Sequence, residues 1–344
     1  MSEPPKNVNG PTGMGPATNE SNVTQDDSEK SQISKCLTLL IEPGSVFEVR
    51  APKCRVTPGK EFRGTASGYF TSDQIGRVAE ILASLDADQV APGWYVTLNP
   101  VKKDLIALAA GRIERQATVT TTDSDILRRT RLLIDIDPVR KAGTSATDEE
   151  VAAALAAARE VGNYLSSLGW PQPLTTMSGN GAALIFAVEL PADDHGLVER
   201  VLKALAGRFD TDVVKIDTGV HNAARITKII GTTARKGDEV RGIPGVADRV
   251  HRRAQLVSYP PSLSPVSREA LEAVAGPAQV ETDAPLRLVR PPEERGARFA
   301  VFDHTPDGVT AYLRKHGVEV TRRASKGGSV WLHLARCPVV PECE

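Results

Sequence analysis

The stretch Leu132-Leu133-Ile134-Asp135-Ile136-Asp137-Pro138 joins a short apolar run to two carboxylates. The apolar residues predict a buried strand, and the two acids come where it ends. Side chains alternate along a strand, so Asp135 and Asp137 point to the same face and repel each other unless a cation neutralises them. Mg²⁺ or Mn²⁺ is the usual partner of such a pair. The alternative is a pair of solvated acids at the end of a strand.

A second strand ends in the same way, in Val213-Val214-Lys215-Ile216-Asp217. Asp135, Asp137 and Asp217 together could hold two metal ions, one at an attacking hydroxyl and one at a leaving pyrophosphate.

Ser178-Gly179-Asn180-Gly181 lies between the two acidic segments. Asn-Gly between two strands is a common two-residue hairpin turn. The backbone N–H groups of such a loop can also approach phosphate oxygens. The two interpretations are compatible.

The most basic part of the chain follows Asp217. A run of this kind is often only a solvated surface, but after a metal-type carboxylate it supplies the cations that triphosphate chemistry requires. Its polar and basic residues are Arg225, Lys228, Thr232, Thr233, Arg235, Lys236, His251, Arg252 and Arg253.

In this order, the three motifs resemble those of the archaeo-eukaryotic primase superfamily, and most closely the primase-polymerase domains of phage and plasmid replication proteins. The similarity covers roughly residues 40–253 and includes Tyr95-Val96-Thr97-Leu98-Asn99-Pro100. The resemblance implies an α+β fold, with an RRM-like antiparallel sheet core and a second small α/β lobe. It implies a template-directed nucleotidyltransferase, a DNA primase and polymerase that uses Mg²⁺ or Mn²⁺. The expected partners are a single-stranded DNA template and primer, NTP or dNTP, and a helicase region in the same longer polypeptide.

The resemblance also implies roles for individual residues. Asp135, Asp137 and Asp217 match the catalytic metal ligands, and Arg225 and Lys228 match the residues that hold the nucleotide's phosphates. The nucleotide-binding loop of the second motif corresponds to Ser178, Gly179, Asn180 and Gly181.

Ala183 departs from the family pattern, in which this position is a histidine that contacts the triphosphate. Alanine has no side-chain donor, and losing one charge-assisted hydrogen bond costs about 1.5–3 kcal/mol. We therefore expect impaired nucleotide binding with metal binding intact. The substitution is compatible with a disabling mutation or with a natural chain that compensates elsewhere.

Two other functions remain open. A replication initiator that has the same fold but has lost catalysis would bind DNA without incorporating nucleotides, and Ala183 favours it. A metal-dependent nuclease could also use three aspartates, but the basic segment with Arg225 and Lys228 counts against it.

The composition is that of a globular protein, with 40% hydrophobic and 25% charged residues among 344 and a net charge of −1. Any nucleic-acid surface must therefore be a local patch. We expect a cytoplasmic protein without a signal peptide or membrane span. Cys337 and Cys343 with His333 offer too few ligands for a closed zinc site, so reduced cysteines are favoured over zinc.

The predicted organisation is a disordered tail (1–34), a catalytic domain (35–259), a Pro-rich linker (260–296) and a small helix-hairpin segment (297–344). Capping boxes at Thr71 and Thr147 predict helices. The other expected helices are 100–110, 193–206, 268–274 and 309–316, and the expected strands are 36–41, 46–49, 94–98, 174–177, 183–190 and 213–216, with a hairpin through Lys326-Gly327-Gly328.

Overall fold

The structure, a computed structural model, describes residues 28–56, 63–109, 111–276, 310, 313–314, 320–326 and 329–334. The chain divides into two compact units, Met1–Ala278 and Gln279–Glu344. In the second unit, β13 (Val320–Lys326) and β14 (Ser329–Leu334) form the predicted antiparallel hairpin. Of the helix expected at 309–316, residues 310 and 313–314 are helical and the others lie outside the described residues.

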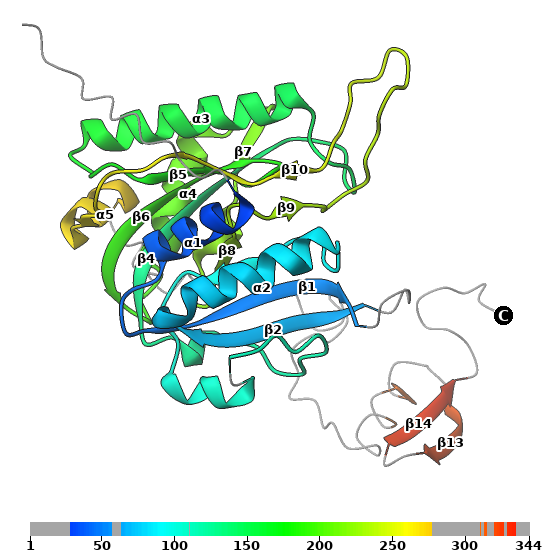
Figure 1. Cartoon of the computed structure of the whole chain (residues 1–344). Helices are drawn as coiled ribbons and strands as arrows, with labels where there is room; N and C mark the ends of the chain where they lie inside the picture. The colour runs from blue at the N-terminus through cyan, green and yellow to red at the C-terminus, as the bar shows by residue number, and fades with distance from the viewer. Residues whose placement is uncertain are drawn as a thin grey trace, which may run out of the picture. The chain divides into compact units, whose positions relative to one another are not determined.

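The first sheet of the larger unit is antiparallel throughout and has the order β2-β1-β3-β8 (Figure 1). Its strands are β1 (Val46–Arg55), β2 (Arg63–Thr71), β3 (Tyr95–Thr97) and β8 (Ile226–Lys228). Helices α1 (Glu29–Leu40) and α2 (Ile75–Ala87) pack against each other, and α2 also packs on β2.

The second sheet has the order β11-β5-β6-β4-β7, with antiparallel neighbours, and a short β12 pairs in parallel with β6. Helix α3 packs on β4, β5, β6 and β7, and α4 packs on β7 and α5. The strands are β4 (Arg128–Pro138), β5 (Leu174–Met177), β6 (Ala182–Pro191), β7 (Val214–Ile216), β11 (Gln255–Ser258) and β12 (Pro265–Val266); the helices are α3 (Asp148–Ser167), α4 (Leu197–Phe209) and α5 (Arg268–Ala275).

Short elements connect these layers. Strands β9 (Thr233–Ala234) and β10 (Arg252–Arg253) pair with each other. The 3₁₀ helices are η1 (Ser72–Gln74), η2 (Lys103–Leu108), η3 (Asp123–Asp125) and η4 (Thr218–His221).

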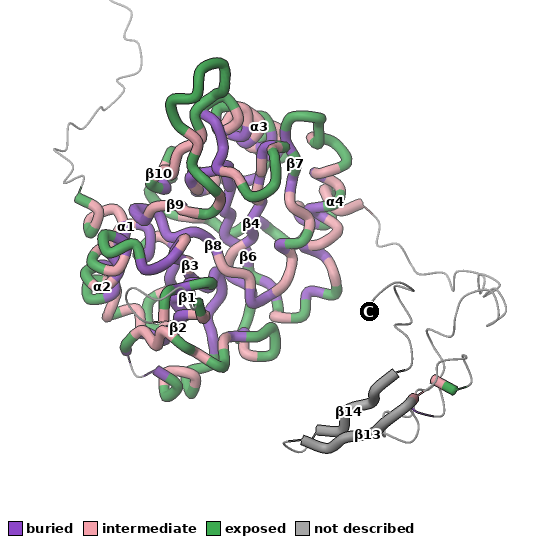
Figure 2. The backbone as a smooth tube through the Cα atoms, turned by 90° about the vertical axis from the view of Figure 1, so that its right-hand side faces the viewer, coloured by how far each residue is buried: buried purple, intermediate pink, exposed green. Residues whose placement is uncertain are grey.

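Side chains along β4 alternate between the two faces of its sheet, so this strand contributes to both the core and the acidic pair. Leu132, Ile134 and Ile136 are almost completely buried on the face that the helices cover, as the period of two requires. Asp135 and Asp137 lie on the opposite face and are partly exposed. Figure 2 shows the same contrast across the unit, with buried positions along the strands and exposed ones in the outer loops.

These findings confirm the α+β class, with antiparallel sheets and helices. Both capping boxes are present: Thr71 with Gln74 precedes α2 through η1, and Thr147 with Glu150 opens α3. No helix in the described part of the chain is long and apolar enough to cross a membrane.

The predicted strand at 36–41 is wrong, because these residues belong to helix α1. Ile33, Cys36, Leu37 and Leu40 are its buried positions, and their spacing is helical. The Ser28 side chain caps the helix by accepting from the Ser31 N–H at 3.2 Å. The predicted tail (1–34) therefore extends too far, since α1 begins at Glu29; residues 1–27 lie outside the described residues.

The predicted linker (260–296) is also partly wrong. Its beginning forms β12 and α5, which confirms the helix predicted at 268–274, and Leu271 of α5 is completely buried against the rest of the unit. Residues 277–296 lie outside the described residues. The helix expected at 100–110 is only the 3₁₀ helix η2, and α4 begins four residues later than expected because Asp194 accepts from the N–H groups of Gly196 and Val198.

Candidate active site

A cavity of about 350 Å³ lies between the two sheets. One wall comes from β1, β3 and β8, and the other from β4, β5 and β6. Its lining residues include Asp135 and Asp137 but not Asp217. Five cationic side chains line it against these two acids, namely Lys53, Arg140, Arg225, Lys228 and Lys236.

Asp135 and Asp137 lie side by side on β4, as the sequence predicts. Burial, together with the charge of Asp137, raises the pKa of Asp135 to about 7 against the opposing effect of Arg225. Asp137 is about half exposed and lies 3.7 Å from the Arg140 guanidinium. A divalent cation fits this pair chemically, because it would offset both the desolvation of Asp135 and the repulsion between the two carboxylates.

Asp217 lies near the pair, and its charge also raises the pKa of Asp135, but it does not line the cavity. Its backbone N–H donates to the carbonyl of Asp135 at 2.9 Å, so the two main chains touch. Its Oδ1 accepts from the Gly219 N–H at 2.8 Å, and its Oδ2 lies 3.6 Å from the Arg225 guanidinium. Among the described residues, no group of three or more His, Cys, Asp or Glu side chains is arranged to hold a metal ion. The structure thus brings two of the three predicted ligands into the cavity.

The Ser178-to-Gly181 segment is a four-residue hairpin loop rather than a two-residue turn, because the Met177–Ala182 pair closes it. Gly179 has a φ of +104°, and a Cβ at this position would lie 2.4 Å from the Ala234 Cβ. A Cβ at Gly181 would lie 2.6 Å from the Ile136 carbonyl oxygen and 2.9 Å from Asp137 Oδ1. Both glycines are therefore required for the loop to pack against the acidic end of β4.

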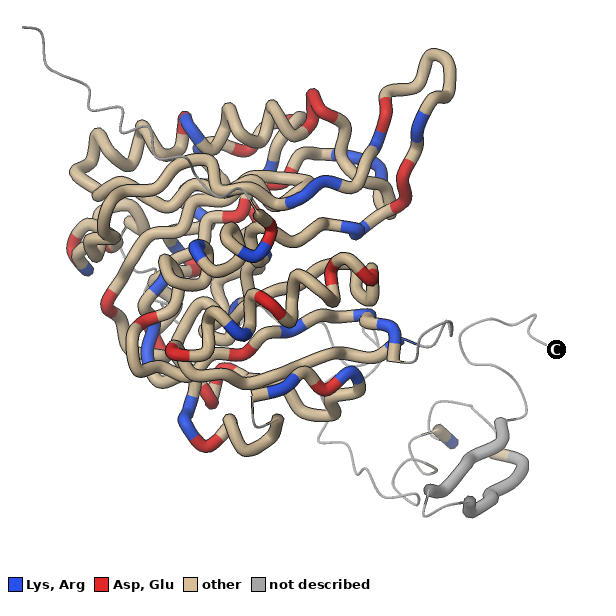
Figure 3. Tube along the Cα trace, viewed as in Figure 1, with Lys and Arg blue, Asp and Glu red and all other residues tan. Residues whose placement is uncertain are grey.

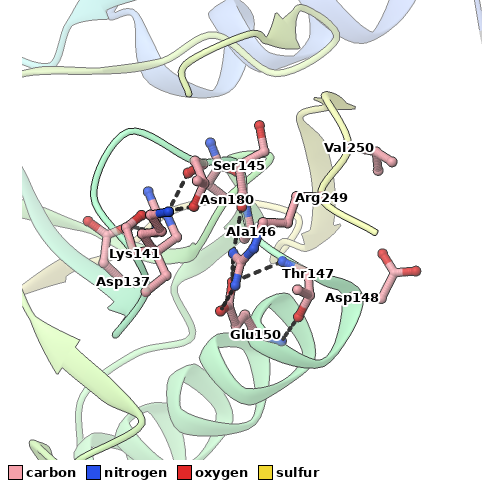
Figure 4. Close-up of polar contacts among 12 residues, drawn as sticks. Asp137, Lys141, Ser145, Ala146, Thr147, Asp148, Glu150, Asn180, Arg249 and Val250 are labelled. Atoms are coloured by element: carbon pink, nitrogen blue, oxygen red, sulfur yellow. Dashed lines mark hydrogen bonds and ion pairs between the residues drawn. The ribbon is translucent and has the colours of Figure 1, made fainter. Parts of the chain in front are cut away.

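Asn180 holds this loop to its surroundings. Its Oδ1 accepts from the backbone N–H of Ala146 at 2.8 Å, just before α3 (Figure 4). Its Nδ2 donates to the carbonyl of Lys236 at 3.2 Å, which fixes the main chain of a cavity-lining lysine. In the same region Arg249 forms a two-point ion pair with Glu150, with N–O distances of 2.8 Å, and so ties the 237–250 segment to α3 (Figure 4).

The two basic residues predicted to hold phosphates both line the cavity. The Arg225 side chain lines the cavity, and its buried Nε has no hydrogen-bond partner among the described residues. Lys228 is 7% exposed, and its Nζ donates to the Thr233 carbonyl at 2.9 Å. Burial lowers the pKa of Lys228 to about 7, with the carboxylate of Asp86 opposing this shift.

Ala183 lies at the centre of the site. It pairs directly with Asp135 on β4 and with Thr176 on β5, and all three residues line the cavity. A larger side chain at this position would extend into the cavity beside Asp135.

Four charged or aromatic lining residues were not assigned to the site from the sequence: Lys53, Tyr95, Arg140 and Lys236. Lys236 belongs to the basic stretch and Tyr95 to the motif that ends at Pro100, so both were within reach of the sequence. Lys53 was signalled only by Pro52, since proline inside a strand often marks a bulge.

No protein-family model matches this chain, and no curated protein matches it significantly. Cys337 and Cys343 lie outside the described residues, as does the side chain of His333, so the expectation about zinc stays a prediction.

Proposed function

We propose that this protein is a template-directed primase-polymerase that transfers nucleotides from NTP or dNTP to a 3′-hydroxyl, with the primase-polymerase fold. One observation carries the proposal: the paired carboxylates of Asp135 and Asp137 share a cavity with a surplus of cations, which come from β1, β8 and the segments next to β4, β8 and β9. A triphosphate with its divalent cation complements such a charge arrangement. The proposal is also supported by the order of motifs in the sequence.

In this proposal Asp135 and Asp137 would hold Mg²⁺ or Mn²⁺, which when bound would activate the hydroxyl and neutralise the leaving pyrophosphate. Arg225 and Lys228 would orient the phosphates. The hairpin loop would limit the space beside Asp137, because Gly181 packs against that carboxylate. Asp217 would fix the short connection to Arg225 through its contacts with Gly219 and the guanidinium.

The first test is incorporation of labelled nucleotide on primed and unprimed single-stranded templates, comparing this chain with Ala183→His. We expect incorporation to rise roughly ten- to a hundredfold in the variant, because a donor is restored beside Asp135. Omission of the divalent cation and Asp135→Asn in the Ala183→His background are the negative controls.

A second candidate function is a catalytically inactive, DNA-binding replication initiator, favoured by the absence of a donor at Ala183. Template binding without incorporation by either chain would support the initiator and rule out the polymerase. Cleavage of labelled DNA in Mn²⁺ without nucleotides would instead support the nuclease.

A further inference from the structure

Three cations, Lys53, Arg55 and Arg63, lie at the end of the β1–β2 hairpin where Arg55 pairs with Arg63. Arg115 belongs to the neighbouring segment, which is hydrogen-bonded to β2 through Glu114 and Ala117. We call these four residues the hairpin-end patch. Within the described part of the chain, none of the four forms an ion pair with a carboxylate. Glu114, which neighbours Arg115, is instead paired with Arg112. Figure 3 shows lysine and arginine positions gathered at this end of β1 and β2.

A β-bulge sets the position of Lys53. The register of β1 and β2 shifts between Ala51 and Cys54, so Pro52 and Lys53 together oppose a single residue of β2. Lys53 has a φ of +59°, a left-handed backbone conformation that is unfavourable for a residue other than glycine. Bulges and strained backbones concentrate where a side chain must be redirected for function. Here the bulge places Lys53 on the wall of the cavity.

Arg55 and Arg63 provide a second unfavourable feature. They are directly opposite each other across β1 and β2, and like charges in this position destabilise a sheet. Among the described residues, the Arg63 guanidinium donates to the Lys53 carbonyl alone, at 3.1 Å. Burial raises the pKa of the Cys54 thiol, and the charges of Arg115 and Arg63 both oppose this shift, so the two guanidinium groups lie near the same residue. An anionic ligand would relieve the repulsion within the patch.

We propose that the hairpin-end patch binds the phosphate backbone of single-stranded DNA where the strand leaves the cavity. The inference rests on the proposed function and names the path of its nucleic-acid partner. A free triphosphate would be held inside the cavity, whereas the patch begins at the cavity wall with Lys53 and continues outside it along the hairpin. An extended polyanion is the ligand that can contact both the cavity and the part of the patch outside it.

The test compares Arg55→Gln/Arg63→Gln with the wild-type chain in binding fluorescein-labelled oligothymidylate, measured by fluorescence anisotropy over a series of salt concentrations. Each lost phosphate contact should reduce the slope of log K against log salt by about 0.7, so we expect a reduction of about 1.4. Near physiological salt this corresponds to roughly tenfold weaker binding. Lys53→Gln alone should reduce the slope by about half as much.

Lys103→Gln/Arg159→Gln is the matched control, because these cations are exposed on η2 and α3 and form no ion pair among the described residues. It should bind DNA like the wild type. Nucleotide triphosphate affinity, measured by calorimetry, should be unchanged in Arg55→Gln/Arg63→Gln. Unfolding temperatures verify that all variants are folded.

An unchanged slope in both Arg55→Gln/Arg63→Gln and Lys53→Gln would overturn the inference. So would an equal loss in the control pair, which would indicate diffuse attraction. Patch-dependent DNA binding without any nucleotide incorporation would support the inference while removing the polymerase function, so the two failures are distinguishable.

Discussion

Asp135 and Lys228 are the two residues of the site whose charged forms are most disfavoured by their surroundings. Burial raises the pKa of Asp135 from 3.8 to about 7 and lowers that of Lys228 from 10.5 to about 7. The folded state binds the proton of Asp135 more tightly than the unfolded state, so this residue reduces stability as the pH rises from about 4 to 7. Lys228 has the opposite effect, because stability recovers as the pH rises from about 7 to 10.

We therefore expect the ligand-free protein to lose stability near neutral pH through these two side chains. Relative to the wild type, Asp135→Asn should gain about 1–2 kcal/mol above pH 7 and almost nothing at pH 4. Lys228→Met should gain a similar amount below pH 7 and almost nothing at pH 10. Urea unfolding across this pH range measures both differences, and each variant serves as the control for the other. If the stability differences of both variants from the wild type do not vary with pH, the pKa shifts assigned to Asp135 and Lys228 are contradicted.

The residues of the site were predictable where a strict period applied. Alternation along β4 was sufficient to place Asp135 and Asp137 on one face. The role of Asp217 was harder to predict. A carboxylate at the end of a strand can also cap the next helix, and the Asp217 side chain accepts from the Gly219 N–H at the start of η4. Lys53 was not assigned, since its position depends on a bulge in the pairing of β1 with β2, for which Pro52 is the only signal in the sequence.

At the scale of elements, the connection from β7 to β8 joins the second sheet to the first and contains both Asp217 and Arg225. Three side chains from other segments hold it. Asp123 Oδ1 accepts from the Ala224 N–H at 2.7 Å, and Asn99 Nδ2 donates to the Ala223 carbonyl at 2.8 Å. Arg129 donates to the His221 carbonyl at 2.7 Å. The orientation of Arg225 is thus set by residues that do not line the cavity.

Asp123→Ala should therefore weaken nucleotide binding indirectly. We expect a stability loss of about 1–2 kcal/mol from the unpaired N–H groups, together with reduced triphosphate affinity measured by calorimetry. Asp123→Asn keeps an acceptor oxygen and should retain most of the stability and most of the triphosphate affinity. If Asp123 acts through Arg225, the double variant with Arg225→Ala should bind no more weakly than Arg225→Ala alone. Fully additive losses would show that the two residues act independently.

Helices were predicted well where a capping box preceded apolar residues at helical spacing. Thr71 with Gln74 and Thr147 with Glu150 fixed the starts of two helices before any tertiary contact was known. Helix α1 was missed because its first turn resembles the polar tail and its last residues, 36–41, form an apolar run that only Thr38 interrupts. Helix α5 was predicted at 268–274, but it was assigned to a linker together with the segment of β12, because the order of these short elements depends on packing against α4 and β6.

At the scale of the whole molecule, every residue of the candidate site and of the hairpin-end patch belongs to the unit Met1–Ala278. The cavity is formed by two sheets of this one unit, and the β7-to-β8 connection joins them. All residues named for the cavity and the patch are therefore present in a chain of residues 1–278.

We accordingly expect a chain of residues 1–278 to fold alone, because its core is continuous across both sheets and the helices that cover them. Its urea unfolding should be a single cooperative transition. Its affinities for oligothymidylate and for nucleotide triphosphate should equal those of the full chain within about twofold, since a difference of that size is only about 0.4 kcal/mol. DNA binding that is tenfold weaker, with cooperative unfolding preserved, would mean that the second unit supplies part of the nucleic-acid surface. Because the hairpin-end patch lies in the first unit, its salt-dependent contribution should survive the truncation in full.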